Sequence, residues 1–179
     1  MKMLFTPQKV FCYVLSLYLY GGSVPTYAHD GTVHISGTIK SNTCTVTDES
    51  RNQTVQLGRV ADKRFFSVGD ASVPQQFIIK LQDCGAAVRE VTVTFSGDAD
   101  TNNPNLLKVD GGSGAASGVG VAILDREKKI IALNAPSESY SLSPHVDAIL
   151  LFFSQYISTS VHVTPGKASA LATFKMTYE

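Results

Sequence analysis

The side chains best suited to chemistry are scattered along this sequence. The four histidines are His29, His34, His145 and His162. They lack the close His, Cys or carboxylate spacings that are typical of a metal site. No Gly-x-Ser-x-Gly sequence follows a predicted strand, as the nucleophile of many hydrolases would require. We therefore expect no metal site, no cofactor and no enzymatic activity.

Glycines are dense between Gly111 and Gly118, as they are in loops that bind phosphate groups. Such a loop needs a strand before it and a helix after it. Residues 119–124 instead have the composition of a strand, so no helix N-terminus would face a phosphate. We predict a flexible connection within a sheet and no nucleotide site.

The first 28 residues have the layout of a secretory signal peptide. An apolar run over residues 10–20 follows two lysines and precedes small residues at Thr26 and Ala28. We predict cleavage after Ala28, so that the mature chain begins at His29. A membrane anchor is the alternative, but a bilayer-spanning helix needs about 20 apolar residues.

Cleavage would leave 151 residues (179 − 28), which is the size of one domain. The chain has 15 basic and 15 acidic residues, and two lysines leave with the signal peptide. The mature chain then carries 13 basic and 15 acidic side chains. This balance predicts no nucleic-acid partner, and we expect no small-molecule substrate.

Two cysteines, Cys44 and Cys84, remain after cleavage, because Cys12 lies in the signal peptide. In an exported chain an even number of cysteines indicates a disulfide, although two buried free thiols are the alternative. Closing a loop of about 40 residues would stabilise the fold by about 4 kcal/mol in the entropic model.

Apolar and polar residues alternate along most of the mature chain, between clusters of glycine, asparagine, aspartate and proline. This period of two predicts an all-β sandwich of about nine short strands. After a first segment at residues 31–40, the predicted strands are 54–57, 76–81, 90–95, 118–124, 129–133, 148–154, 158–163 and 168–178. Residues 125–128 are predicted to form a charged turn. Residues 59–73 show no regular alternation of apolar and polar side chains, so we predict a loop or a short helical turn there.

The alternation is strictest at the two ends of the mature chain. Near the N-terminus one face carries Gly31, Val33, Ile35, Gly37 and Ile39. At the C-terminus one face carries Ala168, Ala170, Ala172, Phe174, Met176 and Tyr178. Ordinary first and last strands of the sandwich would explain both patterns.

The residue pattern of the C-terminal segment is nevertheless more specific than that of an ordinary last strand. Gly166 is the fourteenth residue from the end and Tyr178 is the penultimate one. With the alternation between them, they resemble the C-terminal motif of the chaperone–usher pilins. The resemblance covers essentially all of the mature chain and is greatest for type 1 fimbrial subunits. It also rests on residues 31–44, 55–58, 77–84, 93–97, 118–125 and 172–175.

The resemblance implies an incomplete immunoglobulin-like β-sandwich, which a donor strand from another subunit or a chaperone completes. It assigns residues 29–40 to an N-terminal donor extension and residues 41–179 to a pilin domain. The donor residues would be Gly31, Val33, Ile35, Gly37 and Ile39. The chaperone would face Gly166, Ala172, Phe174, Met176, Tyr178 and Glu179 on the C-terminal strand.

The implied function is that of a structural subunit of a bacterial fimbria that supports cell adhesion. Its partners would be other pilin subunits, a periplasmic chaperone and an outer-membrane usher, and it would pass through the periplasm to the cell surface. The alternatives are a carbohydrate-binding tip adhesin and an adaptor subunit. A periplasmic metal oxidoreductase would need a histidine-rich site.

Overall fold

A computed structural model of the chain describes residues 36–37 and 43–179. The predicted signal peptide and most of the predicted donor segment, including Val33, Ile35 and Ile39, lie outside the described residues. Those assignments therefore stay predictions. The chain divides into two units after Thr38, and the second unit, Ile39–Glu179, is the one whose fold is described below.

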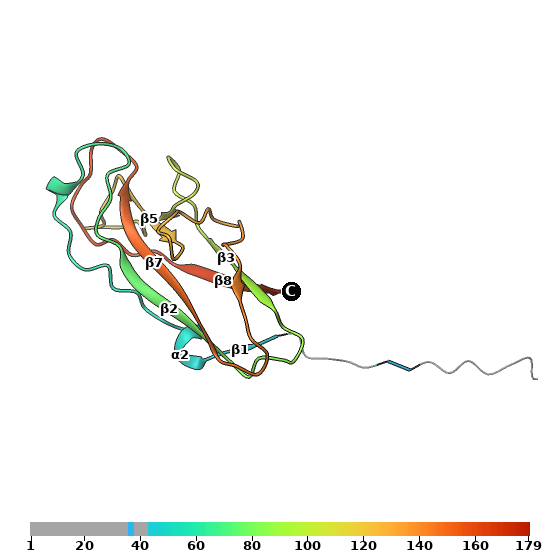
Figure 1. Cartoon of the computed structure of the whole chain (residues 1–179). Coiled ribbons are helices and arrows are strands. Elements are labelled where there is room, and N and C mark those ends of the chain that lie inside the picture. Colours follow the sequence, from blue (N-terminus) through green and yellow to red (C-terminus); the bar gives the residue numbers. More distant parts are fainter. Residues whose placement is uncertain (1–35, 38–42) are drawn as a thin grey trace, which may run out of the picture. The chain divides into compact units, whose positions relative to one another are not determined.

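The described chain folds into two antiparallel sheets, as Figure 1 shows. The first sheet has the order β1 (Thr45–Val46), β2 (Gln75–Gln82), β7 (Ala148–Ser158), β5 (Val119–Leu124) and β4 (Leu107–Lys108). The second has the order β6 (Tyr140–Ser141), β3 (Glu90–Gly97) and β8 (Ala172–Tyr178). The described helices are a single turn each, α2 (Asp48–Arg51) and η1 (Asp62–Arg64). The predicted all-β class is confirmed.

Three predicted strands form no ladder of their own in the structure, and the strand predicted at residues 168–178 begins only at Ala172. Residues 54–57 alternate as predicted but pair with no described strand. Residues 129–133 make a single bridge, Leu124 to Ile130, because the chain turns there to reach β3. The strand predicted at residues 158–163 is absent, since β7 continues unbroken to Ser158 and then ends. By contrast, η1 confirms the short helical turn that was one of the two alternatives predicted for residues 59–73.

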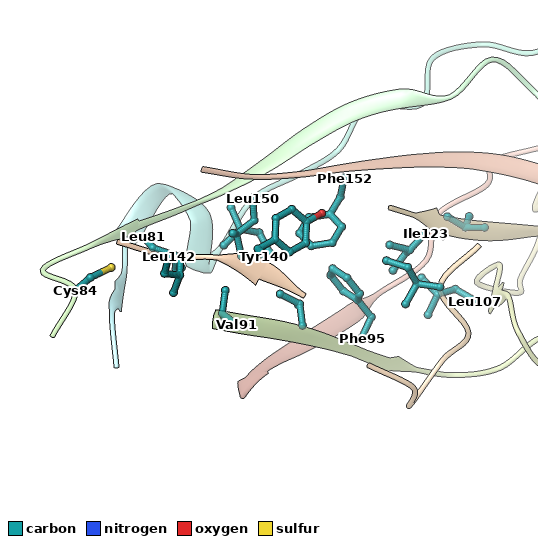
Figure 2. Packing of buried hydrophobic residues seen from close by; sticks show 14 of the residues in the cluster. Leu81, Cys84, Val91, Phe95, Leu107, Ile123, Tyr140, Leu142, Leu150 and Phe152 are labelled. Atoms are coloured by element: carbon teal, nitrogen blue, oxygen red, sulfur yellow. The ribbon is translucent and has the colours of Figure 1, made fainter. Parts of the chain in front are cut away.

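The core fills the space between the two sheets. Phe152 on β7 is fully buried, and its ring centroid lies 5.2 Å from that of Phe95 and 5.4 Å from that of Tyr140. Such aromatic contacts add about 0.5–1.5 kcal/mol to the burial of each pair. Figure 2 shows the core running from Cys84 at one end to Leu107 at the other.

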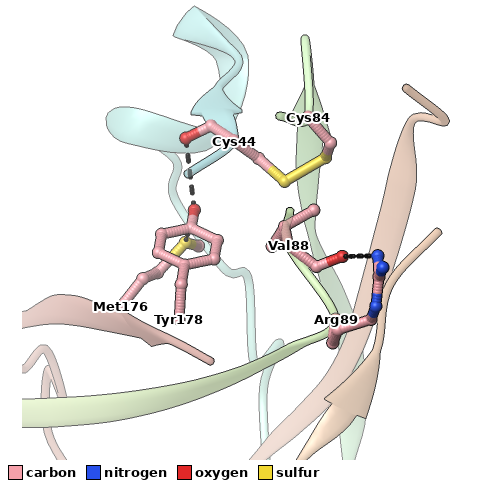
Figure 3. The surroundings of a disulfide bond; sticks show 6 residues. All are labelled: Cys44, Cys84, Val88, Arg89, Met176 and Tyr178. Atoms are coloured by element: carbon pink, nitrogen blue, oxygen red, sulfur yellow. Dashed lines mark hydrogen bonds between the residues drawn. A yellow bond between two sulfur atoms is a disulfide. The ribbon is translucent and has the colours of Figure 1, made fainter. Parts of the chain in front are cut away.

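The disulfide lies at one end of this core. Cys44, just before β1, is bonded to Cys84, just after β2, which confirms the predicted bridge (Figure 3). We call residues 43–51, 83–90 and 143–147, with Glu179, the disulfide end, because β2 and β8 end there and β3 and β7 begin there. The opposite end comprises residues 59–73, 98–118 and 159–171, and we call it the loop end.

Candidate strand-acceptor groove

The last strand, β8, has one edge that no described strand covers. β8 pairs with β3, and beyond its last residue Glu179 and Glu90 exchange two backbone hydrogen bonds, of 3.0 and 3.1 Å. In an antiparallel ladder such bonded pairs recur at every second residue. The intervening residues therefore turn their N–H and C=O groups away from β3. They are Ala172, Phe174, Met176 and Tyr178.

The same four residues direct their side chains between the sheets, because side chains and backbone polar groups both alternate with a period of two. They are half-buried, whereas Val91, Val93 and Phe95 on the neighbouring strand are at most 3% exposed. An additional strand would cover both their backbone groups and their side chains. An open edge of this kind is a site for β-strand addition.

A cavity of about 730 Å³ lies alongside this region. Residues 53–60 form one rim and residues 163–172 form the other, while Phe77, Phe95 and Ile123 belong to its lining. A second cavity of about 700 Å³, lined by residues 44–46, 51–53 and 171–174, continues toward the disulfide end. We call the two cavities together the acceptor groove.

The rim at residues 53–60 explains why a predicted strand has no partner. Val55, Leu57 and Val60 are half-buried beside polar neighbours that are exposed. Leu57 and Val60 pack against the core, but the described residues supply no hydrogen-bonding strand beside this segment. The alternation was visible in the sequence, whereas nothing in it showed that this segment borders a groove.

Tyr178 ties the two sheets together at the disulfide end of the groove. Its hydroxyl donates a hydrogen bond of 3.2 Å to the carbonyl oxygen of Cys44 and lies 3.2 Å from the sulfur of Met176 (Figure 3). Burial raises the pKa of the Tyr178 phenol. The groove is thus bounded at this end by the segment that carries the disulfide.

Gly166 closes the opposite end of the groove. A Cβ atom on this residue would lie 2.4 Å from the backbone carbon of Ala115 and from the nitrogen of Ala116. The backbones are in direct contact there: the Ala116 N–H donates to the Lys167 carbonyl at 2.8 Å, and the Lys167 N–H donates to Gly114 at 2.9 Å. The glycine-rich stretch at residues 111–118 leads into strand β5, as predicted. Its backbone packs against Gly166 and Lys167 at this end of the groove.

The structure thus places Gly166, Ala172 and Phe174 in the lining of the groove, and Met176 and Tyr178 farther along the same open edge of β8. Glu179 is exposed and pairs with Glu90 through its backbone. Among the described residues no three His, Cys, Asp or Glu side chains form a cluster suited to a metal ion. No described helix is long and apolar enough to span a membrane.

Known proteins share this sequence and this fold. The model of the fimbrial protein family matches residues 33–179. The fimbrial-like protein YcbV of Escherichia coli K12 is 44% identical over 154 residues, which cover 86% of this chain and 88% of that protein. The probable major fimbrial subunit LpfA of Escherichia coli O157:H7 is 37% identical over 177 residues, which cover 98% of this chain and 99% of that protein.

Two solved structures show the same architecture. The type I fimbria protein of Burkholderia pseudomallei superposes with a TM-score of 0.60 at 30% identity, covering 75% of this chain and 88% of that one. The P pilus rod subunit PapA superposes with a TM-score of 0.63 at 22% identity, covering 76% of this chain and 99% of that one. The incomplete immunoglobulin-like sandwich is the shared fold, and this chain belongs to the fimbrial protein family.

Proposed function

We propose that this protein is a structural subunit of a bacterial fimbria, and that its acceptor groove receives a β-strand from the next subunit. The observation that carries the proposal is the open edge of β8. Along this edge Ala172, Phe174, Met176 and Tyr178 have half-buried side chains and backbone groups that face away from β3, and Ala172 and Phe174 line the groove.

Donor-strand complementation between chaperones and pilins is a known case of β-strand addition, and we apply it to this groove. The donor would be residues 29–40 of a second copy or of another pilin. Burial of Val33, Ile35 and Ile39 would contribute about 1.5–3 kcal/mol each. Gly31 and Gly37 would lie where the groove has little room.

Before assembly the same edge would be covered by a periplasmic chaperone. The chaperone would pair with β8, and a cationic side chain could bind the free carboxylate of the exposed Glu179. An outer-membrane usher would then exchange the chaperone strand for the donor strand. The finished fimbria at the cell surface would support adhesion. This role needs neither a cofactor nor a catalytic residue.

A peptide-insertion experiment tests the acceptor role. The mature subunit is purified with its chaperone and mixed with a synthetic peptide of residues 29–40. We expect the peptide to displace the chaperone and to remain bound in denaturing gels without boiling. A peptide with Ile35→Asp is the matched control and should not insert, because its carboxylate would enter an apolar groove. Equal behaviour of the two peptides, or failure of both, would contradict the proposal.

Electron microscopy of cells that lack the protein would then separate the possible roles within the fimbria. Loss of all fibres would identify a main subunit. A change in fibre length or number would identify a minor one.

A further inference from the structure

A second surface adjoins the acceptor groove at the loop end. The loop at residues 59–73 is held firmly: the Phe66 and Ser67 N–H groups both donate to the Asp70 carboxylate at 2.7 Å, and the Ser158 N–H donates to the Asp70 carbonyl at 2.9 Å. Phe66 is nevertheless 79% exposed and Val68 is 59% exposed. A large apolar side chain on an ordered, exposed loop indicates a contact with another molecule.

Three cations and the carboxylate of Asp70 share a cavity with this phenylalanine. Arg59, Lys63, Arg64 and Phe66 line a cavity of about 910 Å³, which shares residues 57–60 with the groove rim. Within the described residues, none of the three cations takes part in an ion pair. We call these four residues the loop-end patch. Its charge and its exposed ring match a partner that offers carboxylates beside a smaller apolar side chain.

The disulfide end of the same molecule offers such a surface. Asp83 follows β2 and Asp147 precedes β7, and the paired strand ends Leu81 and Ala148 bring the two carboxylates to the same end. Neither aspartate forms an ion pair within the described part of the chain. Val146, which precedes Asp147 in the sequence, is 54% exposed. We call Asp83, Val146 and Asp147 the disulfide-end patch.

The direction of the donor strand decides whether these two patches meet. All described strand pairs in both sheets are antiparallel, and antiparallel pairs are slightly more stable than parallel ones.

This direction brings the donor's C-terminal end out at the loop end. The four residues 40–43 that then lead to Cys44 span at most about 14 Å. The disulfide end of the incoming subunit must therefore lie close to the loop end of the subunit that it enters. Insertion in the parallel direction would instead bring two acidic disulfide ends together.

We propose that consecutive copies of this chain dock head to tail, with the disulfide-end patch of the incoming subunit on the loop-end patch of the receiving one. This contact rests on the proposed function and adds a second interface to the donor strand. It orients the incoming subunit and favours assembly of this chain with itself. Phe66 supplies the apolar centre, and Lys63 and Arg64 attract Asp83 and Asp147.

Charge reversal tests the contact. Mature subunits with Lys63→Glu and Arg64→Glu, which lie outside the groove lining, or with Asp83→Lys and Asp147→Lys, are purified as chaperone complexes, and the rate of polymer formation is measured at low salt. Each pair of changes should slow assembly about tenfold, because steering by complementary charges acts mainly on association rates. A chain that carries all four changes should return to within about threefold of the wild-type rate.

Two controls isolate the interface. Lys108→Glu reverses a charge at the same end on β4 and should leave the rate unchanged. Insertion of the peptide of residues 29–40 should proceed equally in all variants, which also shows that they fold, because the peptide carries no disulfide end. Phe66→Ser should slow whole-subunit assembly and spare peptide insertion.

The outcomes separate the two proposals. Wild-type rates for both reversed pairs, or no recovery in the fourfold variant, would overturn the docking contact while leaving strand acceptance intact. If the wild-type peptide fails to insert, the proposed function itself is wrong.

Discussion

The Tyr178 hydroxyl lies 3.2 Å from the carbonyl oxygen of Cys44 and donates a hydrogen bond to it. This bond joins the end of the open strand to the segment that carries the disulfide. Tyr178→Phe should lower the free energy of unfolding of the peptide-complemented subunit by about 1 kcal/mol, since a partly buried acceptor loses its partner. Urea denaturation monitored by circular dichroism measures the change. An unaltered midpoint would show that the bond adds nothing.

The contact between Gly166 and Ala115 predicts a strong effect of a single methyl group. Gly166→Ala would place a Cβ atom 2.4 Å from backbone atoms that cannot move without breaking the bonds around Lys167. We expect a loss of at least about 2 kcal/mol in stability and a lower periplasmic yield. Gly111→Ala is the matched control, because nothing lies within 4 Å of its Cβ position. Equal yields would refute the close-contact argument.

The inward face of β8 should matter more to the chaperone than its outward face. Phe174→Asp would put a carboxylate into the groove at a cost of several kcal/mol, whereas Thr177→Asp leaves it in solvent. We expect Phe174→Asp to abolish co-purification with the chaperone and Thr177→Asp to preserve it. Retention of both variants would contradict the assignment of β8 to the chaperone.

The donor extension should be dispensable for chaperone binding but required for polymerisation. Ile35→Asp in the full chain should still yield a chaperone complex, because the acceptor groove is intact, yet it should fail to add to a growing fibre. Thr32→Asp, on the opposite face of the segment, should assemble nearly normally. If Ile35→Asp fibres form and resist denaturant like wild type, the donor assignment is wrong.

Tyr140 predicts a specific response to alkaline pH. The residue is 6% exposed, its hydroxyl donates to the Leu151 carbonyl at 2.6 Å, and burial raises its pKa to about 12. The unfolded phenol titrates near pH 10. The protonated phenol therefore contributes its full stability below about pH 10, and this contribution is lost as the pH rises toward 12.

Comparison with Tyr140→Phe isolates that contribution from the titration of other groups. The wild type should be the more stable protein at pH 8, and the difference between the two should shrink as the pH approaches 12. Thermal denaturation at a series of pH values measures it. A difference that stays constant with pH would exclude a role for this phenol.

The long strands could be predicted from the sequence because their side chains alternate, as in β3, or form a continuous apolar run, as in β5, which is buried throughout. β2, β3 and β5 lie within two residues of their predicted positions. β1, β4 and β6 have two residues each, which is too short for any period to appear. Their pairing is decided by tertiary contacts, such as the bridge from Leu107 to Val121.

The candidate site was predictable on one side of the groove. The inward set from Ala172 to Tyr178 follows from alternation, and its role follows from the family resemblance. The rim at residues 53–60 looked like an ordinary strand, because a sequence does not show whether a strand's partner lies in the same molecule. The close approach of Gly166 to Ala115 was also invisible, since it joins segments about 50 residues apart.

The open edge of β8 also has a mechanical meaning. In a fibre joined through this edge, tension along the fibre axis acts parallel to the bound donor strand. The backbone hydrogen bonds at Ala172, Phe174, Met176 and Tyr178 would then be loaded in shear and share the force. If the donor strand were peeled away from one end, these hydrogen bonds would instead break one after another. The resistance of each joint to pulling therefore grows with the number of residues that pair along β8, and the groove length sets the force at which the fibre breaks.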